Sequence, residues 1–389
     1  MDFDSIKASR IVVRFLHFFA IWPNQGSSLD TPWIRRCNRY WPYLIHGVMT
    51  FMFTVLMWVE AFVTNDFERR AEVLFIMLTM TSLLAKIVNN WRRHHIAREL
   101  LEEWSTSQQF KVNFGQERDI WELAHRRFAL VTYVYIFCSA GSGVCILMSS
   151  LLNYPNKLPF WMWVPYDWTQ PVNFWCTFAF QVIAVPFSCL SNVGMDLLNC
   201  YLMLHISLCL ELVGMRMAAL APTGNSLESE QQLLAQFVAI IALHRRIKMH
   251  TNRIQMFISS STLIQILLSS IIICLTIYCL QMRTTLQDPF FFLMKSQYLF
   301  AMTWQIFLPC MYGNQIIDKA NQLVNDLYTC QWPDMSVKMR RQIFTFMIYL
   351  NRPMELQAGS FFVIGLVLFG KIMNQAYSLL ALLLNVDDE

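Results

Sequence analysis

Seven apolar stretches constrain this chain more than any other feature of its sequence. Each is at least as long as the roughly 20 residues that a helix needs to cross ~30 Å of hydrocarbon. The stretches fall at residues 43–64, 71–90, 127–152, 173–195, 257–281, 291–312 and 357–384. Hydrophobic types make up 56% of the 389 residues and charged types only 14%, which is more apolar surface than one water-soluble core needs. We therefore predict an all-α membrane protein with seven transmembrane helices and the lipid bilayer as its main solvent.

The distribution of Lys and Arg predicts the orientation of these helices. Cytoplasmic connections retain positive charge near the ends of membrane spans. Of the 30 Lys and Arg residues, 23 lie before the first span or in every second connection after it, four lie on the opposite side and three lie within spans. We therefore expect a cytoplasmic amino terminus and an extracellular carboxyl terminus, which is the reverse of a G-protein-coupled receptor.

The amino-terminal segment shows no cleavable signal. Its apolar run "IVVRFLHFFAIW" follows Asp2 and Asp4 and is interrupted by Arg14 and His17. Arg10, Arg14 and His17 share one face of a helix, so the run predicts an amphipathic helix on the inner membrane surface.

The cytoplasmic connections have helical character. "ERDIWELAHRR" and "GNQIIDKANQLVNDLY", for example, mix charges with apolar residues at three-to-four spacing. We expect helices two, four, five and six to continue into a cytoplasmic helical anchor layer, with independent surface helices as the alternative. The chain is then one unit over residues 1–389, divided into a cytoplasmic segment 1–42, helices one to six in 43–312, an anchor segment 313–356, and a last helix with a short extracellular tail in 357–389.

Motifs of common enzymes are missing from the sequence. It contains no G-x-S-x-G, no Walker loop and no HExxH. Asp196 and Glu211 lie at and beyond the cytoplasmic end of the fourth span, so we expect both carboxylates to be close to water. The paired ionisable groups that a transporter places at mid-membrane are not seen in the sequence. We expect a protein that is not an enzyme, with no metal, no cofactor and no nucleic-acid partner.

The last apolar stretch carries a polar stripe. On a helix with 100° per residue, Lys371, Asn374, Gln375, Ser378 and Asn385 share one narrow arc, which Leu382 and Val386 interrupt near the outer end. If several copies surround an axis, this arc lines an aqueous path, and the apolar pair narrows it to a constriction that gates by dewetting. The alternative is that the polar side chains only hydrogen-bond to neighbouring helices.

The carboxyl-terminal third resembles the insect odorant receptor family. The stretch "FLPCMYGNQIIDKANQLVNDLYTCQW" carries that family's pattern at Cys310, Gly313, Asn314, Tyr328 and Trp332. "RPMELQAGSFF" and "LFGKIMNQAYS" continue it. The chain departs from the pattern after Ser378, where Leu379 and Leu380 replace an aromatic pair. A gustatory receptor would have a different closing motif, with an aromatic residue beside a Gln-Phe pair.

The resemblance implies a function. Members of the family are subunits of ligand-gated, non-selective cation channels, assembled as heterotetramers with a shared odorant co-receptor in the plasma membrane of olfactory sensory neurons. The last helix lines the pore, and the gate positions match Leu382 and Val386. Small volatile odorants bind in the outer half of the bundle between helices two, three, four and six. Candidate ligand contacts at that depth are Phe75, Thr79, Gly143, Leu147, Phe178, Gln181, Tyr298 and Met302. A gustatory receptor-like channel and a G-protein-coupled receptor are the alternatives.

Overall fold

The longest helices of this chain exceed the thickness of a bilayer. The computed structural model describes residues 6–22, 40–112, 115–152, 158–222, 227–282 and 289–387. Helix α6 (Pro171–Ala218) has 48 residues and α7 (Leu227–Met282) has 56. At 1.5 Å per residue they are about 70 Å and about 85 Å long, more than twice the ~30 Å of hydrocarbon. Both helices must therefore extend well beyond a membrane that they cross.

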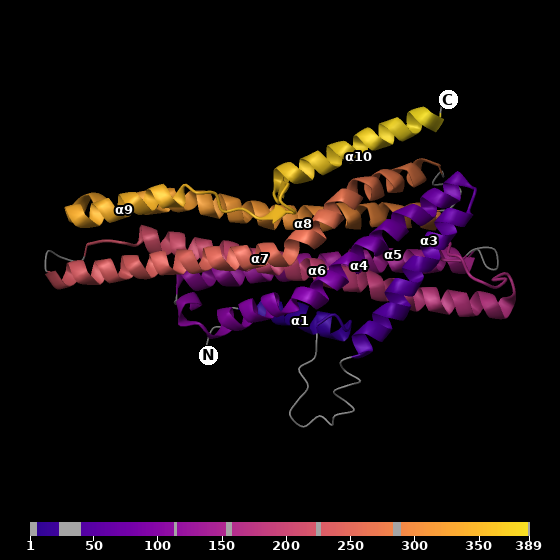
Figure 1. Ribbon diagram of the computed structural model, residues 1–389, viewed down its shortest axis with the longest axis horizontal. Coiled ribbons are helices and arrows are strands. Elements are labelled where there is room, and N and C mark those ends of the chain that lie inside the picture. Colours follow the sequence, from indigo (N-terminus) through magenta and orange to yellow (C-terminus); the bar gives the residue numbers. More distant parts are fainter. Residues whose placement is uncertain are drawn as a thin grey trace, which may run out of the picture.

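The other elements surround these two helices. Helix α1 (Lys7–Phe18) comes first, and a π-helical turn, η1 (Gly47–Met52), leads into α3 (Phe53–Val63). The remaining elements are α4 (Phe67–Thr106), η2 (Gln108–Phe110), α5 (Gln116–Leu152), α8 (Pro289–Tyr328), η3 (Trp332–Asp334), α9 (Val337–Leu350), β1 (Gln357–Ala358), β2 (Phe362–Val363) and α10 (Leu366–Asp387). They form an elongated bundle with α9 at one end of the long axis and α3 at the other (Figure 1).

The first six predicted spans coincide with helices. Tyr40–Val63, Arg69–Thr106, Pro171–Ala218 and Glu228–Leu280 are each long and apolar enough to cross a membrane, and Leu366–Leu382 is a shorter apolar helix. The stretches 127–152 and 291–312 lie within α5 and α8. Helices α4, α6, α7 and α8 run unbroken past the ends of their spans, so the alternative of independent surface helices is wrong for these segments.

The seventh predicted span begins too early. The stretch 357–384 was expected to be one helix, but β1 and β2 form an antiparallel hairpin, and α10 starts only at Leu366. Side chains of α7 bind the backbone of this hairpin. Gln255 accepts from the N–H of Gln357 at 2.6 Å and donates to its carbonyl at 2.6 Å. Gly359 has φ +63°, a backbone angle that residues with a side chain rarely adopt, so a glycine suits this turn.

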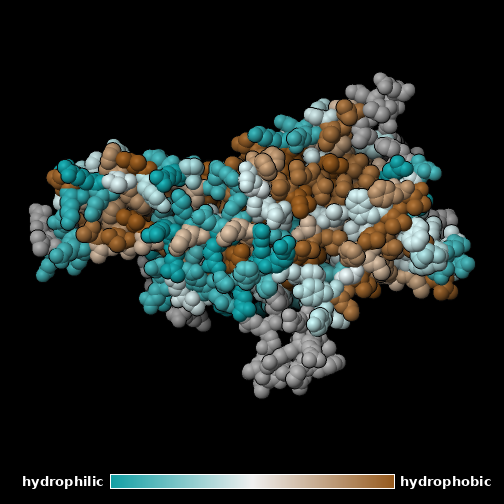
Figure 2. All heavy atoms as spheres, in the orientation of Figure 1, coloured by the Kyte–Doolittle hydropathy of each residue, from teal (hydrophilic) through white to brown (hydrophobic). Residues whose placement is uncertain are grey.

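The two halves of the molecule differ in surface character. Hydrophobic residues gather on the half that holds α3 and α10, and hydrophilic residues predominate over much of the rest of the visible face (Figure 2). Phe62, Phe137 and Val172 are 77%, 79% and 74% exposed, which is costly in water but suits contact with lipid. We call the opposite part the polar end; it comprises the ends of α4, α6 and α8 nearest to Thr106, Ala218 and Tyr328, the start of α7, and α9.

Helix α1 is amphipathic, as the sequence predicts. It buries Ala8, Ser9, Val12 and Leu16, whereas Arg10 and Arg14 stay exposed. It packs against α6 at Gly194, where an added Cβ would lie 2.9 Å from the ring of Phe15. A glycine at this position lets the two helices pack closely. The location of α1 on a membrane surface remains a prediction.

Candidate functional site

A cavity of about 240 Å³ lies between α4, α5, α6 and α8. These are helices two, three, four and six of the predicted bundle. Phe160, from the segment before α6, also contributes to the wall. Most of the lining is aliphatic, aromatic or sulfur-containing, and the polar side chains are few. The lining residues are Phe75, Ile76, Thr79, Met80, Leu83, Tyr135, Ser139, Ala140, Gly143, Val144, Phe160, Val185, Pro186, Ser188, Cys189, Leu190, Asn192, Val193, Met294, Tyr298, Ala301 and Met302.

The structure brings five of the eight predicted ligand residues together at this cavity. Phe75, Thr79, Gly143, Tyr298 and Met302 all line it. Their spacing explains why they meet, since Phe75 and Thr79 are one turn apart on α4, and Tyr298 and Met302 are one turn apart on α8. The side chain of Leu147 lies outside the described part of the chain.

Two of the predicted ligand residues lie away from the cavity. Phe178 stacks on Phe174 with ring centroids 5.9 Å apart. Gln181 is only 1% exposed, and its amide binds the backbone of Phe160, accepting from the N–H at 3.0 Å and donating to the carbonyl at 2.9 Å. Gln181 is therefore not one of the residues that line the cavity. Its amide is already satisfied, and it holds Phe160 in the cavity wall.

Thr79 and Tyr298 form a polar pair at the cavity. The Thr79 hydroxyl lies 2.9 Å from the carbonyl oxygen of Phe75 and 2.5 Å from the Tyr298 hydroxyl. A hydroxyl has one proton. If Thr79 donates it to the carbonyl of its own helix, then Tyr298 donates to Thr79, and the tyrosine oxygen keeps only lone pairs for any third group. The Tyr298 ring is fixed by an edge-on contact with Phe75, whose centroid is 5.0 Å away.

Next to the cavity lies an ion pair that the sequence interpretation missed. Lys86 Nζ lies 2.6 Å from Asp196 Oδ1 and 2.8 Å from Asn192 Oδ1. Gln305 Nε2 donates to Asp196 Oδ2 at 2.7 Å, and the Tyr135 hydroxyl is 3.5 Å from the same oxygen. The side chains of Lys86 and Asp196 are 1% and 4% exposed. Four helices thus contribute to one buried polar network.

This network corrects two expectations. Asp196 was expected close to water, but α4, α5 and α8 all contribute polar groups that contact it and enclose it. Paired ionisable groups were not expected, yet Lys86 and Asp196 form such a pair. A lone charge within an apolar span was the available signal, because such a charge in a membrane protein is usually paired. Glu211, by contrast, pairs with Lys319 at 3.0 Å and remains 26% exposed, so it does have access to solvent.

Among the described residues, none covers the polar stripe of helix α10 between Lys371 and Leu382. This helix packs mainly on α7 and α8, and its buried side consists of Leu368, Ile372, Ala376 and Leu380. The exposed side carries Lys371, Asn374, Gln375, Ser378 and Leu382. Ser378 Oγ donates to the Asn374 carbonyl of the same helix at 2.9 Å rather than to another helix. The side chains of Asn385 and Val386 lie outside the described part.

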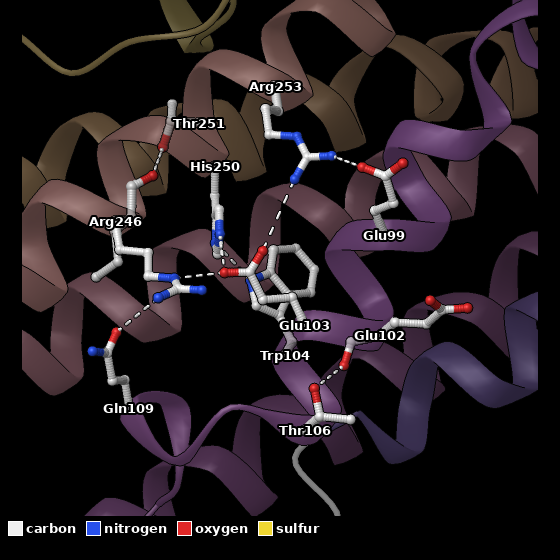
Figure 3. Close-up of polar contacts among 11 residues, drawn as sticks. Glu99, Glu102, Glu103, Trp104, Thr106, Gln109, Arg246, His250, Thr251 and Arg253 are labelled. Atoms are coloured by element: carbon white, nitrogen blue, oxygen red, sulfur yellow. Dashed lines mark hydrogen bonds and ion pairs between the residues drawn. The ribbon is translucent and has the colours of Figure 1, made fainter.

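At the polar end, ionic contacts join α4 to α7 (Figure 3). Glu103 accepts from Arg246 at 2.6 Å and from His250 Nε2 at 3.0 Å, and Arg253 binds Glu99. Trp104 Nε1 donates to His250 Nδ1 at 3.0 Å, so the neutral imidazole satisfies both of its ring nitrogens. Burial lowers the pKa of His250 below its usual 6.5, although Glu103 opposes this effect. The cluster fixes the two helices against each other.

The described residues contain no group of three or more His, Cys, Asp and Glu side chains arranged to hold a metal ion. The polar clusters described above are ion pairs and hydrogen-bonded networks.

Comparison with known proteins agrees with this architecture. Residues 66–377 match the family described as 7tm Odorant receptor. Odorant receptor 94a of Drosophila melanogaster is 34% identical over 386 residues, which cover 99% of each chain. Odorant receptor 46a, isoform A, of Drosophila melanogaster is 24% identical over 384 residues, or 96% of each chain. Two structures of the olfactory receptor OR5 from Machilis hrabei, one of them in complex with eugenol, match 99% of this chain and 100% of their own chain with a TM-score of 0.85 at 16% identity. The chain therefore belongs to the odorant receptor family.

Proposed function

We propose that this chain is the odorant-tuned subunit of a ligand-gated, non-selective cation channel and that its ligand occupies the cavity between α4, α5, α6 and α8. The observation that carries this proposal is the cavity itself, which is about 240 Å³ in volume and has a mostly apolar lining. Small volatile molecules offer few hydrogen-bonding groups, so a site for them needs mainly apolar contacts and a few polar ones. The eugenol complex of OR5 supports a small organic ligand for a protein of this fold.

The pore is assigned to α10. No helix in the described part of the chain covers its exposed polar arc, whereas a helix in lipid needs protein or water against such an arc. Copies of α10 around a central axis satisfy this need, with Lys371, Asn374, Gln375, Ser378 and Asn385 toward the path and Leu382 and Val386 as the constriction. The channel is a heterotetramer of this chain and the odorant co-receptor subunit.

The orientation in the membrane follows from charge. Of the 30 Lys and Arg residues, 23 lie before the first predicted span or in every second connection after it, and this side of the molecule, which includes the polar end, faces the cytoplasm. The amino terminus is then cytoplasmic, the carboxyl terminus is extracellular, and the polar end forms the anchor layer between subunits. The site of action is the plasma membrane of olfactory sensory neurons. Membership of the odorant receptor family decides against the gustatory receptor and G-protein-coupled receptor alternatives.

Recording whole-cell currents tests the channel function. Cells expressing this chain with the co-receptor are exposed to a panel of small ketones, esters, alcohols and aromatics, and cells with the co-receptor alone serve as the control. We expect panel members to evoke a cation current only when this chain is present. Surface-expressed subunits that respond to no odorant, or responses that need a G protein, would overturn the proposal.

Epitope tags test the orientation separately. A tag at the carboxyl terminus should be stained on intact cells, and a tag at the amino terminus should be stained only after permeabilisation. Surface labelling of the amino terminus would contradict the inverted topology without affecting the identification of the cavity.

A further inference from the structure

The amide of Asn192 forms part of the cavity wall. Asn192 lies on α6, lines the cavity and is only 6% exposed. Its Oδ1 accepts from Lys86 Nζ at 2.8 Å. Among the described residues, its Nδ2 has no hydrogen-bond partner. A primary amide nitrogen carries two donors, so this buried side chain keeps unused donor capacity at the surface of the cavity.

The ion pair fixes which end of this amide faces the cavity. An ammonium group only donates hydrogen bonds, so it selects the oxygen of Asn192 and not the nitrogen. Lys86 cannot turn away easily, because it also binds Asp196 at 2.6 Å, and Gln305 holds the second oxygen of Asp196 at 2.7 Å. Rotating the amide would bring its NH₂ against the ammonium. The nitrogen of Asn192 is therefore held toward the space that the residue lines.

Other polar groups at the cavity are already engaged. Thr79 and Tyr298 bond to each other at 2.5 Å, Tyr135 contacts Asp196 at 3.5 Å, and Ser188 shares a hydrogen bond with Thr50 at 3.2 Å. A ligand that gives Asn192 no acceptor leaves a buried donor without a partner, which is costly. An acceptor oxygen on the ligand removes this penalty.

We propose that Asn192, positioned by the Lys86–Asp196 ion pair, is a specificity-determining residue that selects ligands with a hydrogen-bond-accepting oxygen, such as ketones, aldehydes or esters, over hydrocarbons of the same shape. This inference rests on the proposed function, because it concerns the ligand of the same cavity. The ion pair orients the amide of Asn192 and does not itself touch the ligand.

Matched ligands test the proposal in the unmodified receptor. Currents from cells with this chain and the co-receptor are recorded for a straight-chain ketone and for the hydrocarbon in which a methylene replaces the carbonyl. We expect the half-maximal concentration of the ketone to be lower by about tenfold, as a site built around a hydrogen bond discriminates against a ligand that lacks it. Equal values for the two ligands overturn the proposal. If no ligand of any class evokes current, the proposed function fails instead.

Substitution assigns the effect to Asn192. Asn192→Leu preserves approximate size and removes the donor, so the ketone should lose its advantage while the hydrocarbon response stays or improves. Asn192→Ala is the second variant and should also abolish the advantage. Met302→Leu is the matched control at the same cavity, and we expect it to shift both ligands by a similar factor. A ketone advantage that persists in either Asn192 variant overturns the assignment.

Discussion

Lys86 on α4 and Asp196 on α6 form an ion pair with 2.6 Å between Nζ and Oδ1, and each side chain is less than 5% exposed. Removing a charge from water is expensive, and a buried pair is stable only when further hydrogen bonds satisfy its remaining atoms. Here Asn192 accepts from the ammonium, and Gln305 donates to the carboxylate. The pair joins the cavity wall to α8, which also packs against α10 through the rings of Phe307 and Phe369.

Breaking this pair should destabilise the subunit strongly. We expect Asp196→Leu and Lys86→Met each to lower the free energy of unfolding by about 3–5 kcal/mol, because each leaves one uncompensated buried charge. The double variant should lose much less than the sum of the two. Melting of detergent-purified protein and surface labelling measure this effect. Strictly additive losses would show that the two charges do not stabilise each other.

Tyr298, which lines the cavity, and Gln181, which binds the backbone of Phe160 in the cavity wall, should behave differently. Tyr298→Phe removes the oxygen that can accept from a ligand and should raise the half-maximal concentration of alcohols about three- to tenfold while changing that of ketones less. Gln181→Leu breaks the contact with Phe160 and should affect all ligands alike or lower surface expression. Dose-response curves for matched alcohols and ketones distinguish the two. A selective effect of Gln181→Leu on one ligand class would contradict its structural role.

Sequence reasoning chose the candidate ligand residues from the family resemblance and from their depth in the spans. Five of them line the cavity, among them the one-turn neighbours Phe75 with Thr79 and Tyr298 with Met302. Sequence reasoning did not foresee the contacts of Gln181, because polarity and depth do not reveal that a backbone segment 21 residues earlier already satisfies the amide. It also missed Lys86, because the partner of a buried charge is set by the packing of α4 on α6.

The start of the last helix was unpredictable for a similar reason. Residues 357–365 are apolar enough to begin a membrane helix, but their backbone is hydrogen-bonded to α7. Gln255 binds Gln357, and Ser259 accepts through its carbonyl from the N–H of Gly359 at 3.2 Å. Contacts this distant in the sequence leave no periodic signal. The six earlier spans were predictable because length and hydrophobicity alone define them.

Acidic pH should destabilise the polar end through His250. The groups that face it or its partners are Glu103, Glu99, Arg246, Arg253, Trp104 and His205. A histidine whose folded pKa lies below its unfolded value of 6.5 binds fewer protons when folded. The contribution of His250 to the free energy of unfolding is therefore fully present above about pH 6.5 and is lost as the pH falls toward the folded pKa. Burial raises the pKa of the Glu103 carboxyl, but Arg246 and His250 lower it more, so the net shift is downward. Protonation of Glu103 therefore reduces the stability only at more acidic pH, below the 4.5 of an ordinary glutamate.

The variant His250→Gln tests this assignment. A glutamine amide can accept from Trp104 and donate to Glu103 but does not titrate. We expect the melting temperature of purified wild type to fall between pH 7.5 and 5.5, and that of His250→Gln to fall less. Some slope should remain, because burial also lowers the pKa of His205, and that of His244 to about 4. An unchanged pH dependence in the variant would show that His250 does not titrate in this range.

Leu382 should control the closed state of the pore. It is 66% exposed on the same arc of α10 as Ser378 and Asn374, whereas Leu380 is only 7% exposed and packs inward. A narrow apolar ring closes an aqueous path by excluding water, so Leu382→Ser should stabilise a wetted, leaky state. The leak should be partial, because co-receptor subunits still contribute their own apolar side chains.

The matched control for this prediction is Leu380→Ser, which places the same hydroxyl two residues away on the buried face. We expect Leu382→Ser to raise ligand-free cation current or change ion permeability at near-normal surface expression. Leu380→Ser should mainly lower expression, since it buries a polar group against α7 and α8 and removes apolar packing. Whole-cell recording with surface biotinylation measures both quantities. Wild-type resting current and selectivity in Leu382→Ser, together with altered permeation in Leu380→Ser, would mean that the buried face of α10, and not its polar arc, lines the pore.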